Sequence, residues 1–163
     1  NRHDLVSLAA VMAQALWLAA EGPQACREPA EQAALGRLYE RAQLMERAIE
    51  AYELADATGD AEVRRHALAR LAVLHRRASR HAEAASAWQR IVDLVPRGRR
   101  TLTSLERRAV EALAIHHEHR AKDLDSARRF AEALGAASTG RQEAERARRL
   151  RRLERKMSGR LLE

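Results

Sequence analysis

A segment of this chain recurs after 36 residues, and the recurrence constrains the fold more than any other feature. Ala84 and Trp88 lie 36 residues after Ala48 and Tyr52, and the members of each pair share one helical face because they are four residues apart. A looser third copy, with Phe130 in the aromatic position, follows after about 42 residues. Such periods are typical of helix pairs that bury their apolar faces only against their neighbours. The sequence therefore predicts an all-α, antiparallel helix-pair solenoid of about 7–8 helices.

The repeated positions resemble the tetratricopeptide consensus. The matching residues are Leu35, Gly36, Tyr39, Ala48, Tyr52 and Ala55 in the first copy and Leu71, Ala72, Ala84, Trp88 and Pro96 in the second. The resemblance implies three tetratricopeptide-like helix pairs over residues 29–136. A repeat of this kind fixes an architecture and does not name a ligand.

Composition agrees with a helical chain. Only 3% of the residues are aromatic, and the seven glycines and three prolines cluster at the proposed joints, such as Gly22-Pro23 and Pro96-Arg97-Gly98. N-caps of the next helices are expected at Asp60 and at Thr103. Thr103 is followed three residues later by Glu106, which is the spacing of a capping box.

The first predicted helix, residues 5–20, is apolar almost all round. It is shorter than the roughly 20 residues that a membrane span needs, so we expect no membrane association. A soluble helix that is apolar on every side must be covered on every side. We therefore interpret residues 1–21 as a connecting helix from a missing upstream domain, with a protein partner or a homodimer contact through Leu5–Leu18 as its cover.

Two short segments resemble ribonuclease-H-like exonucleases of the YprB type. Asn1-Arg2-His3-Asp4-Leu5-Val6-Ser7-Leu8 is similar to the segment that ends the nuclease domain, and Ile115-His116-His117-Glu118-His119-Arg120-Ala121-Lys122-Asp123 is similar to a Tyr-Tyr-Glu-His-Arg-x-Lys-Asp segment of the family. The resemblance implies a parent protein with a metal-dependent 3'-5' exonuclease domain that uses Mg²⁺ or Mn²⁺. It also implies that Asp4 corresponds to the last acidic metal ligand.

Asp4 alone does not make a nuclease. Two-metal phosphodiester hydrolysis needs several carboxylates that converge on ions about 4 Å apart. The alternative role for Asp4 is structural: an acidic residue at a helix N-terminus interacts favourably with the helix dipole. We therefore expect this fragment to be no enzyme and to carry no cofactor of its own.

The formal charge of +7 is concentrated near the C-terminus. Residues 139–163 are predicted to form a basic capping helix, with Thr139 as a candidate N-cap. A basic loop and the start of the third repeat add further cations. The candidate nucleic-acid contacts are Arg97, Arg99, Arg100, Arg107, Arg108, Arg148, Arg149, Arg151, Arg152, Arg155 and Lys156. Instead of contacting nucleic acid, the loop could be a solvent-exposed connector, and the last helix could serve only to cap the solenoid.

Three imidazoles, His116, His117 and His119, stand beside Glu118. Zinc motifs on helices place two ligands at i and i+4 with a third elsewhere, whereas His116 and His119 are three apart. Packing and capping roles are therefore favoured, and no metal site is predicted.

These observations favour a non-catalytic interaction module of a ribonuclease-H-like exonuclease, which mediates protein–protein contacts and binds single-stranded nucleic acid electrostatically. The alternative is a free-standing tetratricopeptide adaptor that binds peptides in a groove formed by the first helices of its pairs. The single cysteine, Cys26, forms no internal disulfide, so a reducing cytoplasm is expected.

Overall fold

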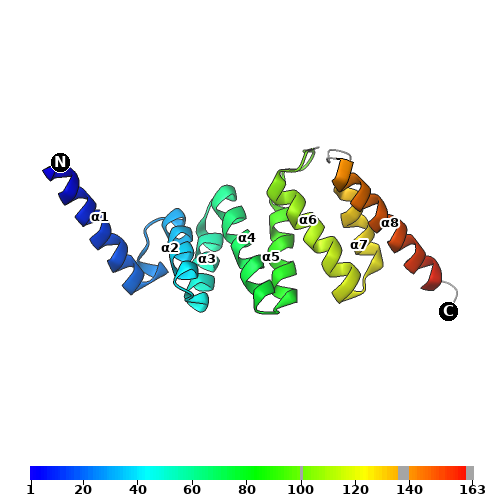
Figure 1. Cartoon of the computed structure of the whole chain (residues 1–163), viewed down its shortest axis with the longest axis horizontal. Helices are drawn as coiled ribbons and strands as arrows, with labels where there is room; N and C mark the ends of the chain where they lie inside the picture. The colour runs from blue at the N-terminus through cyan, green and yellow to red at the C-terminus, as the bar shows by residue number, and fades with distance from the viewer. Residues whose placement is uncertain (100, 136–139, 161–163) are drawn as a thin grey trace. The chain divides into compact units, whose positions relative to one another are not determined.

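The computed structural model describes residues 1–99, 101–135 and 140–160. Within these residues the chain forms eight α-helices, one 3-10 turn and one π-helical turn, and it contains no strand (Figure 1). The all-α prediction is confirmed. The elements are α1 (Arg2–Glu21), η1 (Pro23–Ala25), α2 (Pro29–Arg41), α3 (Met45–Thr58), α4 (Ala61–Arg77), α5 (His81–Asp93), α6 (Ser104–His116), η2 (His117–Ala121), α7 (Leu124–Ala133) and α8 (Gly140–Arg160).

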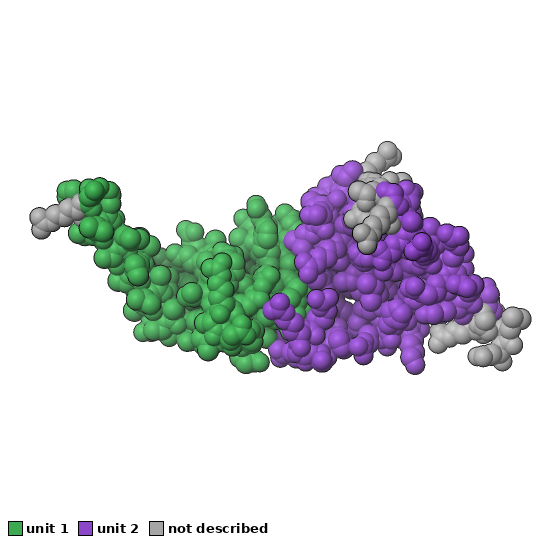
Figure 2. All heavy atoms as spheres, viewed as in Figure 1, with its two compact units in different colours: residues 1–74 green, residues 75–163 purple. Residues whose placement is uncertain are grey.

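The chain divides into two compact units, residues 1–74 (unit 1) and residues 75–163 (unit 2), which are coloured separately in Figure 2. Residues 61–74 of α4 belong to unit 1 and residues 75–77 to unit 2. The predicted division into a connecting helix, three repeats and a capping helix stays a prediction.

Unit 1 is built on the tight pairing of α2 with α3. A Cβ atom at Gly36 would lie 2.8 Å from the ring of Tyr52, so only glycine lets the two helices approach this closely. The Tyr52 ring is buried, and its hydroxyl donates to Glu40, which also accepts from Arg70 Nε at 3.0 Å. Gly36 and Tyr52, two of the residues that match the repeat consensus, thus lie in direct contact between α2 and α3.

Two of the predicted helix caps are present. Asp60 Oδ1 accepts from the backbone amides of Glu62 and Val63, each at 2.9 Å. Thr103 and Glu106 form a reciprocal capping box at the start of α6, in which each side chain accepts from the other residue's backbone amide. These bonds satisfy amide groups that a helix N-terminus leaves without partners. The predicted cap Thr139 lies outside the described residues.

Unit 2 packs α5, α6, α7 and α8 against one another in chain order (Figure 1). Ala127 and Ala131 of α7 and Leu153 of α8 form a buried cluster, and Leu124 and Leu150 pack against it. The small side chains on α7 allow α8 to approach closely, and Leu150 and Leu153 dock the last helix there.

The chain between α6 and α7 widens into the π-helical turn η2 before it reverses. Lys122 then adopts a left-handed backbone with φ of 56°, and Asp123 begins α7 by accepting from the amide of Ser126. The His117 ring stacks on Phe130, with centroids 5.4 Å apart. The His-Glu-His segment is thus a turn that the sequence did not predict.

Helix α1 is longer than the predicted helix of residues 5–20: it has 20 residues, from Arg2 to Glu21. By length and composition alone, His3–Glu21 is apolar enough to cross a membrane. The sequence-based argument that this helix is too short for a span was therefore wrong. Its C-terminal turn is fixed to unit 1 by the Tyr39 hydroxyl, which donates to the Ala19 carbonyl at 2.9 Å, and by Arg47, which donates to the Ala20 carbonyl.

Candidate functional site

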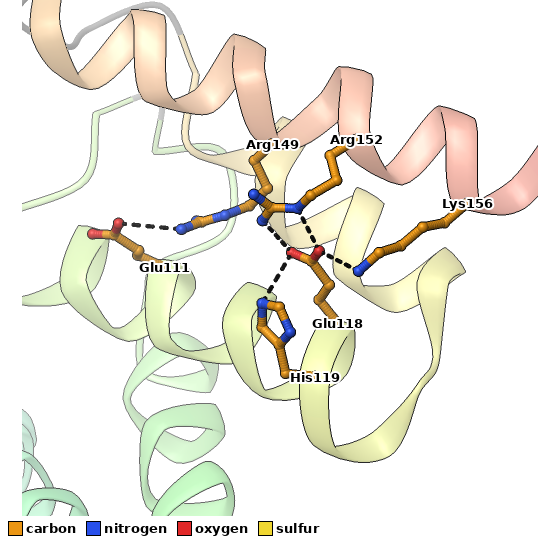
Figure 3. A network of polar contacts seen from close by, with 6 residues as sticks. All are labelled: Glu111, Glu118, His119, Arg149, Arg152 and Lys156. Atoms are coloured by element: carbon orange, nitrogen blue, oxygen red, sulfur yellow. Dashed lines mark hydrogen bonds and ion pairs between the residues drawn. The ribbon is translucent and has the colours of Figure 1, made fainter.

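The strongest polar network in the described chain surrounds Glu118, in the turn η2 (Figure 3). Arg152 donates to both carboxylate oxygens, from Nε at 2.6 Å and from Nη2 at 2.7 Å. Lys156 Nζ donates at 2.8 Å, and His119 Nε2 lies 3.6 Å away. The Glu118 side chain has no exposed surface, whereas Arg152 and Lys156 are each about two-fifths exposed. One buried carboxylate therefore holds two cations of α8.

This arrangement has a clear electrostatic consequence. The pKa of Glu118 is lowered from 4.5 to about 2. Hydrogen bonds from Arg152 are the largest cause, burial acts in the opposite direction, and a hydrogen bond from Lys156 lowers the pKa further. The carboxylate is therefore ionised throughout the neutral range. Bidentate arginine pairs of this kind also fix geometry, because two parallel bonds set the orientation of the guanidinium plane.

Other cations of α8 also bind the body of unit 2. Arg146 donates to the carbonyls of Ala131 and Glu132 at the end of α7. The buried Arg149 pairs with Glu111 of α6 at 3.6 Å (Figure 3). With Arg152 and Lys156 these residues form one inner face of the helix. Arg149, Arg152 and Lys156, all predicted nucleic-acid contacts, thus have intramolecular ion pairs that the sequence analysis did not foresee.

Three predicted contacts on α8 lie on its other side. Arg148, Arg151 and Arg155, which we call the outer arginines, are exposed. Among the described residues no ion pair is found for any of them, although Arg151 Nε donates weakly to the Ala147 carbonyl at 3.4 Å. They follow the spacing i, i+3 and i+7, so they share one face of the helix.

The predicted contacts before α8 divide in a similar way. Arg97 is exposed, whereas Arg99 pairs with Glu106, whose side chain is fully buried. Arg107 donates to the Leu134 carbonyl at 2.9 Å, and Arg108 lies over the ring of Trp88. Arg100 lies outside the described residues. Arg97 and the outer arginines are thus exposed cations within unit 2.

Unit 2 also contains a groove that the sequence analysis missed. It has a volume of about 440 Å³ and is formed by the last turn of α4, by α5 and α6, and by η2. Its lining residues are Arg76, His81, Ala84, Ala85, Trp88, Arg108, Glu111, Ala112, Ile115, His116, His119 and Arg120. The signal in the sequence was the run of alanines on facing helices, which leaves space where larger side chains would have filled it.

Helix α1 provides a second surface. Its large apolar side chains are exposed within the described structure: Leu5, Val6, Leu8, Val11, Met12, Leu16 and Trp17. Most of them show more than half of their surface, Leu16 as much as 69%. Scattered exposed hydrophobic residues are ordinary, but a continuous apolar helix is the kind of patch that marks an interaction site.

The residues predicted by the exonuclease resemblance do not assemble a metal centre here. Asp4 lies in the first turn of α1 with 88% of its side chain exposed. Across residues 1–99, 101–135 and 140–160 no group of three or more histidine, cysteine, aspartate or glutamate residues could hold a metal ion. Asp4 therefore does not fit a two-metal site by itself, and Glu118, the acid of the second motif, is engaged with Arg152 and Lys156.

Two side chains with reactive functional groups have shifted pKa values. Burial, together with Glu31, raises the pKa of the Cys26 thiol, so the thiolate is disfavoured. Burial and the neighbouring His117 lower the pKa of His116, so this groove residue is neutral at physiological pH.

Comparisons of this chain with known protein families, with curated proteins and with solved structures find no match.

Proposed function

We propose that this chain is a non-catalytic helical-repeat module that binds a protein partner through α1, and that its parent is a ribonuclease-H-like exonuclease of the YprB type. The observation that carries the proposal is the continuous apolar surface of α1. Hydrogen bonds from Tyr39 and Arg47 tie the C-terminal end of the helix to the rest of unit 1, and most of the described length of the helix is solvent-exposed.

The size of this surface makes a partner energetically reasonable. Full burial of one large, fully exposed apolar side chain stabilises a complex by about 1.5–3 kcal/mol. Seven half-exposed side chains therefore supply on the order of 10 kcal/mol. That amount is comparable with the cost of association, about 4–15 kcal/mol, so α1 supports an interface but needs contacts from neighbouring residues as well.

The decisive experiment compares the chain with a Leu8→Glu/Leu16→Glu variant in affinity capture, after nuclease treatment and at moderate salt. We expect the wild-type chain alone to retain the ribonuclease-H-like domain of its parent protein, supplied as a separate polypeptide. The same capture by both forms, or flotation of the wild-type chain with lipid vesicles and no protein captured, would contradict the proposal. Metal-dependent cleavage of a single strand by the purified chain would overturn its non-catalytic character.

Self-association through α1 is a distinct outcome of the same surface. A homodimer would bury Leu5–Leu18 against a second copy and would appear in sedimentation equilibrium as a concentration-dependent mass. The Leu8→Glu/Leu16→Glu variant should then sediment as a monomer under the same conditions.

A second candidate function is electrostatic binding of single-stranded nucleic acid by the outer arginines. Their shared exposed face favours it, because Arg148, Arg151 and Arg155 can reach successive phosphates without breaking the inner-face pairs. Few aromatic faces are exposed for base stacking, so sequence-specific recognition is not expected. The free-standing peptide-binding adaptor remains the alternative to an exonuclease parent.

A further inference from the structure

The groove in unit 2 has an apolar floor and a cationic rim. Ala84, Ala85 and Ala112 leave room between α5 and α6, and Ile115 has 43% of its surface exposed at one end. Trp88 lines the same space but is itself only 6% exposed. A groove of about 440 Å³ falls within the range of about 300–1,000 Å³ in which side chains or small ligands are enclosed.

The rim of the groove carries a net positive charge, because its single acid is paired with an arginine that is not part of the lining. Arg76, Arg108 and Arg120 are exposed around the groove, and Glu111 is the one acid in its lining. Arg149 lies 3.6 Å from Glu111 and neutralises much of its charge. Three guanidinium groups thus surround an apolar depression with little negative charge to offset them.

The floor distinguishes a peptide from a nucleic acid. Proteins that bind single strands stack bases on exposed aromatic faces. Here the Trp88 ring is buried and Arg108 lies 5.5 Å from its centroid, so the ring is not open to a base. Alanine and isoleucine surfaces instead suit aliphatic side chains, and the arginines suit carboxylates beside them.

We propose that this groove binds an acidic amphipathic segment of a protein partner, with aliphatic side chains on the floor and carboxylates against Arg76, Arg108 and Arg120. The inference rests on the proposed function, because both treat the chain as a protein-binding module. It adds a second surface that is independent of α1 and names the chemistry of what that surface recognises.

A defined peptide tests the proposal with the full chain. The probe is a fluorescein-labelled helical peptide of about 16 residues, with leucines along one face and glutamates on both flanks. We expect saturable binding by fluorescence anisotropy with a Kd on the order of 10 µM, weakening as salt is raised. Peptides with lysine in place of glutamate, or alanine in place of leucine, should bind at least about tenfold more weakly.

Matched variants locate the site. Ile115→Asp should weaken binding of the acidic peptide at least about tenfold, whereas Leu38→Asp, at 45% exposure in α2, should not change it. Arg120→Glu should weaken binding similarly, and Arg148→Glu on the outer face of α8 should leave it unchanged. Circular dichroism confirms folding, and the exposed Arg120 variant keeps the test decisive if Ile115→Asp is unstable.

The outcomes separate this inference from the function proposed above. Failure of the acidic peptide to bind, or equal binding by the groove and control variants, overturns the groove proposal alone when α1-dependent capture persists. Competition for the groove by a short oligothymidylate, lost in Arg120→Glu, would assign it to nucleic acid instead. Peptide binding without any α1-dependent partner would leave the groove proposal standing and refute the proposed role of α1.

Discussion

The network around Glu118 makes a quantitative prediction about how α8 is held. Glu118→Gln keeps the shape of the side chain but removes the charge that Arg152 and Lys156 share. A pKa lowered from 4.5 to about 2 corresponds to about 3 kcal/mol of stability for the ionised side chain at neutral pH. Arg152 and Lys156 are partly exposed and can be rehydrated, so we expect the variant to lose about 2–3 kcal/mol.

The pH dependence has a definite sign. The folded-state pKa of Glu118 is below its unfolded value, so the stabilisation is complete well above pH 4.5 and is lost as the pH falls towards 2. Between pH 7 and pH 3 the wild-type chain should lose about 2 kcal/mol through this group alone. The Gln variant lacks that component, so the gap between the two proteins should narrow on acidification.

Urea denaturation provides the measurement. Trp88 is buried in unit 2 and Trp17 is half-exposed on α1, so a Trp17→Phe background makes tryptophan fluorescence report on unit 2. The control is Glu132→Gln, which breaks an exposed ion pair with Arg128 and should cost less than about 0.5 kcal/mol. A loss below about 1 kcal/mol for Glu118→Gln, or a gap independent of pH, would refute the reasoning.

Three further predictions follow from the packing, a cap and the charge. Gly36→Ala should lower the free energy of unfolding, measured by thermal denaturation, by about 1–3 kcal/mol, because the added Cβ would meet the Tyr52 ring. The control Gly140→Ala should not destabilise the chain, because a Cβ there has nothing within 4 Å. Thr103→Ala should cost about 1 kcal/mol by the same measurement, and a loss confined to a few tenths would contradict the capping box. Oligothymidylate binding by the outer arginines should show a log–log salt slope near −2, and replacement of all three by glutamine should abolish that slope.

Much of the fold follows from local sequence signals. The positions of Pro29, Asp60 and Thr103 predict where three helices begin, and the observed helices α2, α4 and α6 start at those positions or one residue later. Gly36 matches the repeat consensus, but its close contact with the Tyr52 ring became visible only in the structure. These features are readable because caps, breakers and apolar periodicity act over a few residues.

The candidate sites were only partly predictable. Counting charges identified the basic C-terminal helix but could not separate its inner face from its outer arginines. The histidine segment drew attention through its imidazoles, whereas its glutamate makes the main contacts. Spacing does not separate them either, because Arg149, Arg152 and Lys156 follow i, i+3 and i+7 just as the outer arginines do.

The sequence by itself determined that this chain is helical, where α2, α4 and α6 begin, and that its positive charge lies near the C-terminus. Only the tertiary structure decided that Glu118 neutralises part of that charge, that the alanines of α5 and α6 line a groove, and that α1 extends to 20 residues and is mostly exposed. The physical reason is that propensity and capping are local, whereas burial, ion pairing and groove shape depend on residues far apart in the chain, such as Glu118 and Lys156, which are 38 positions apart.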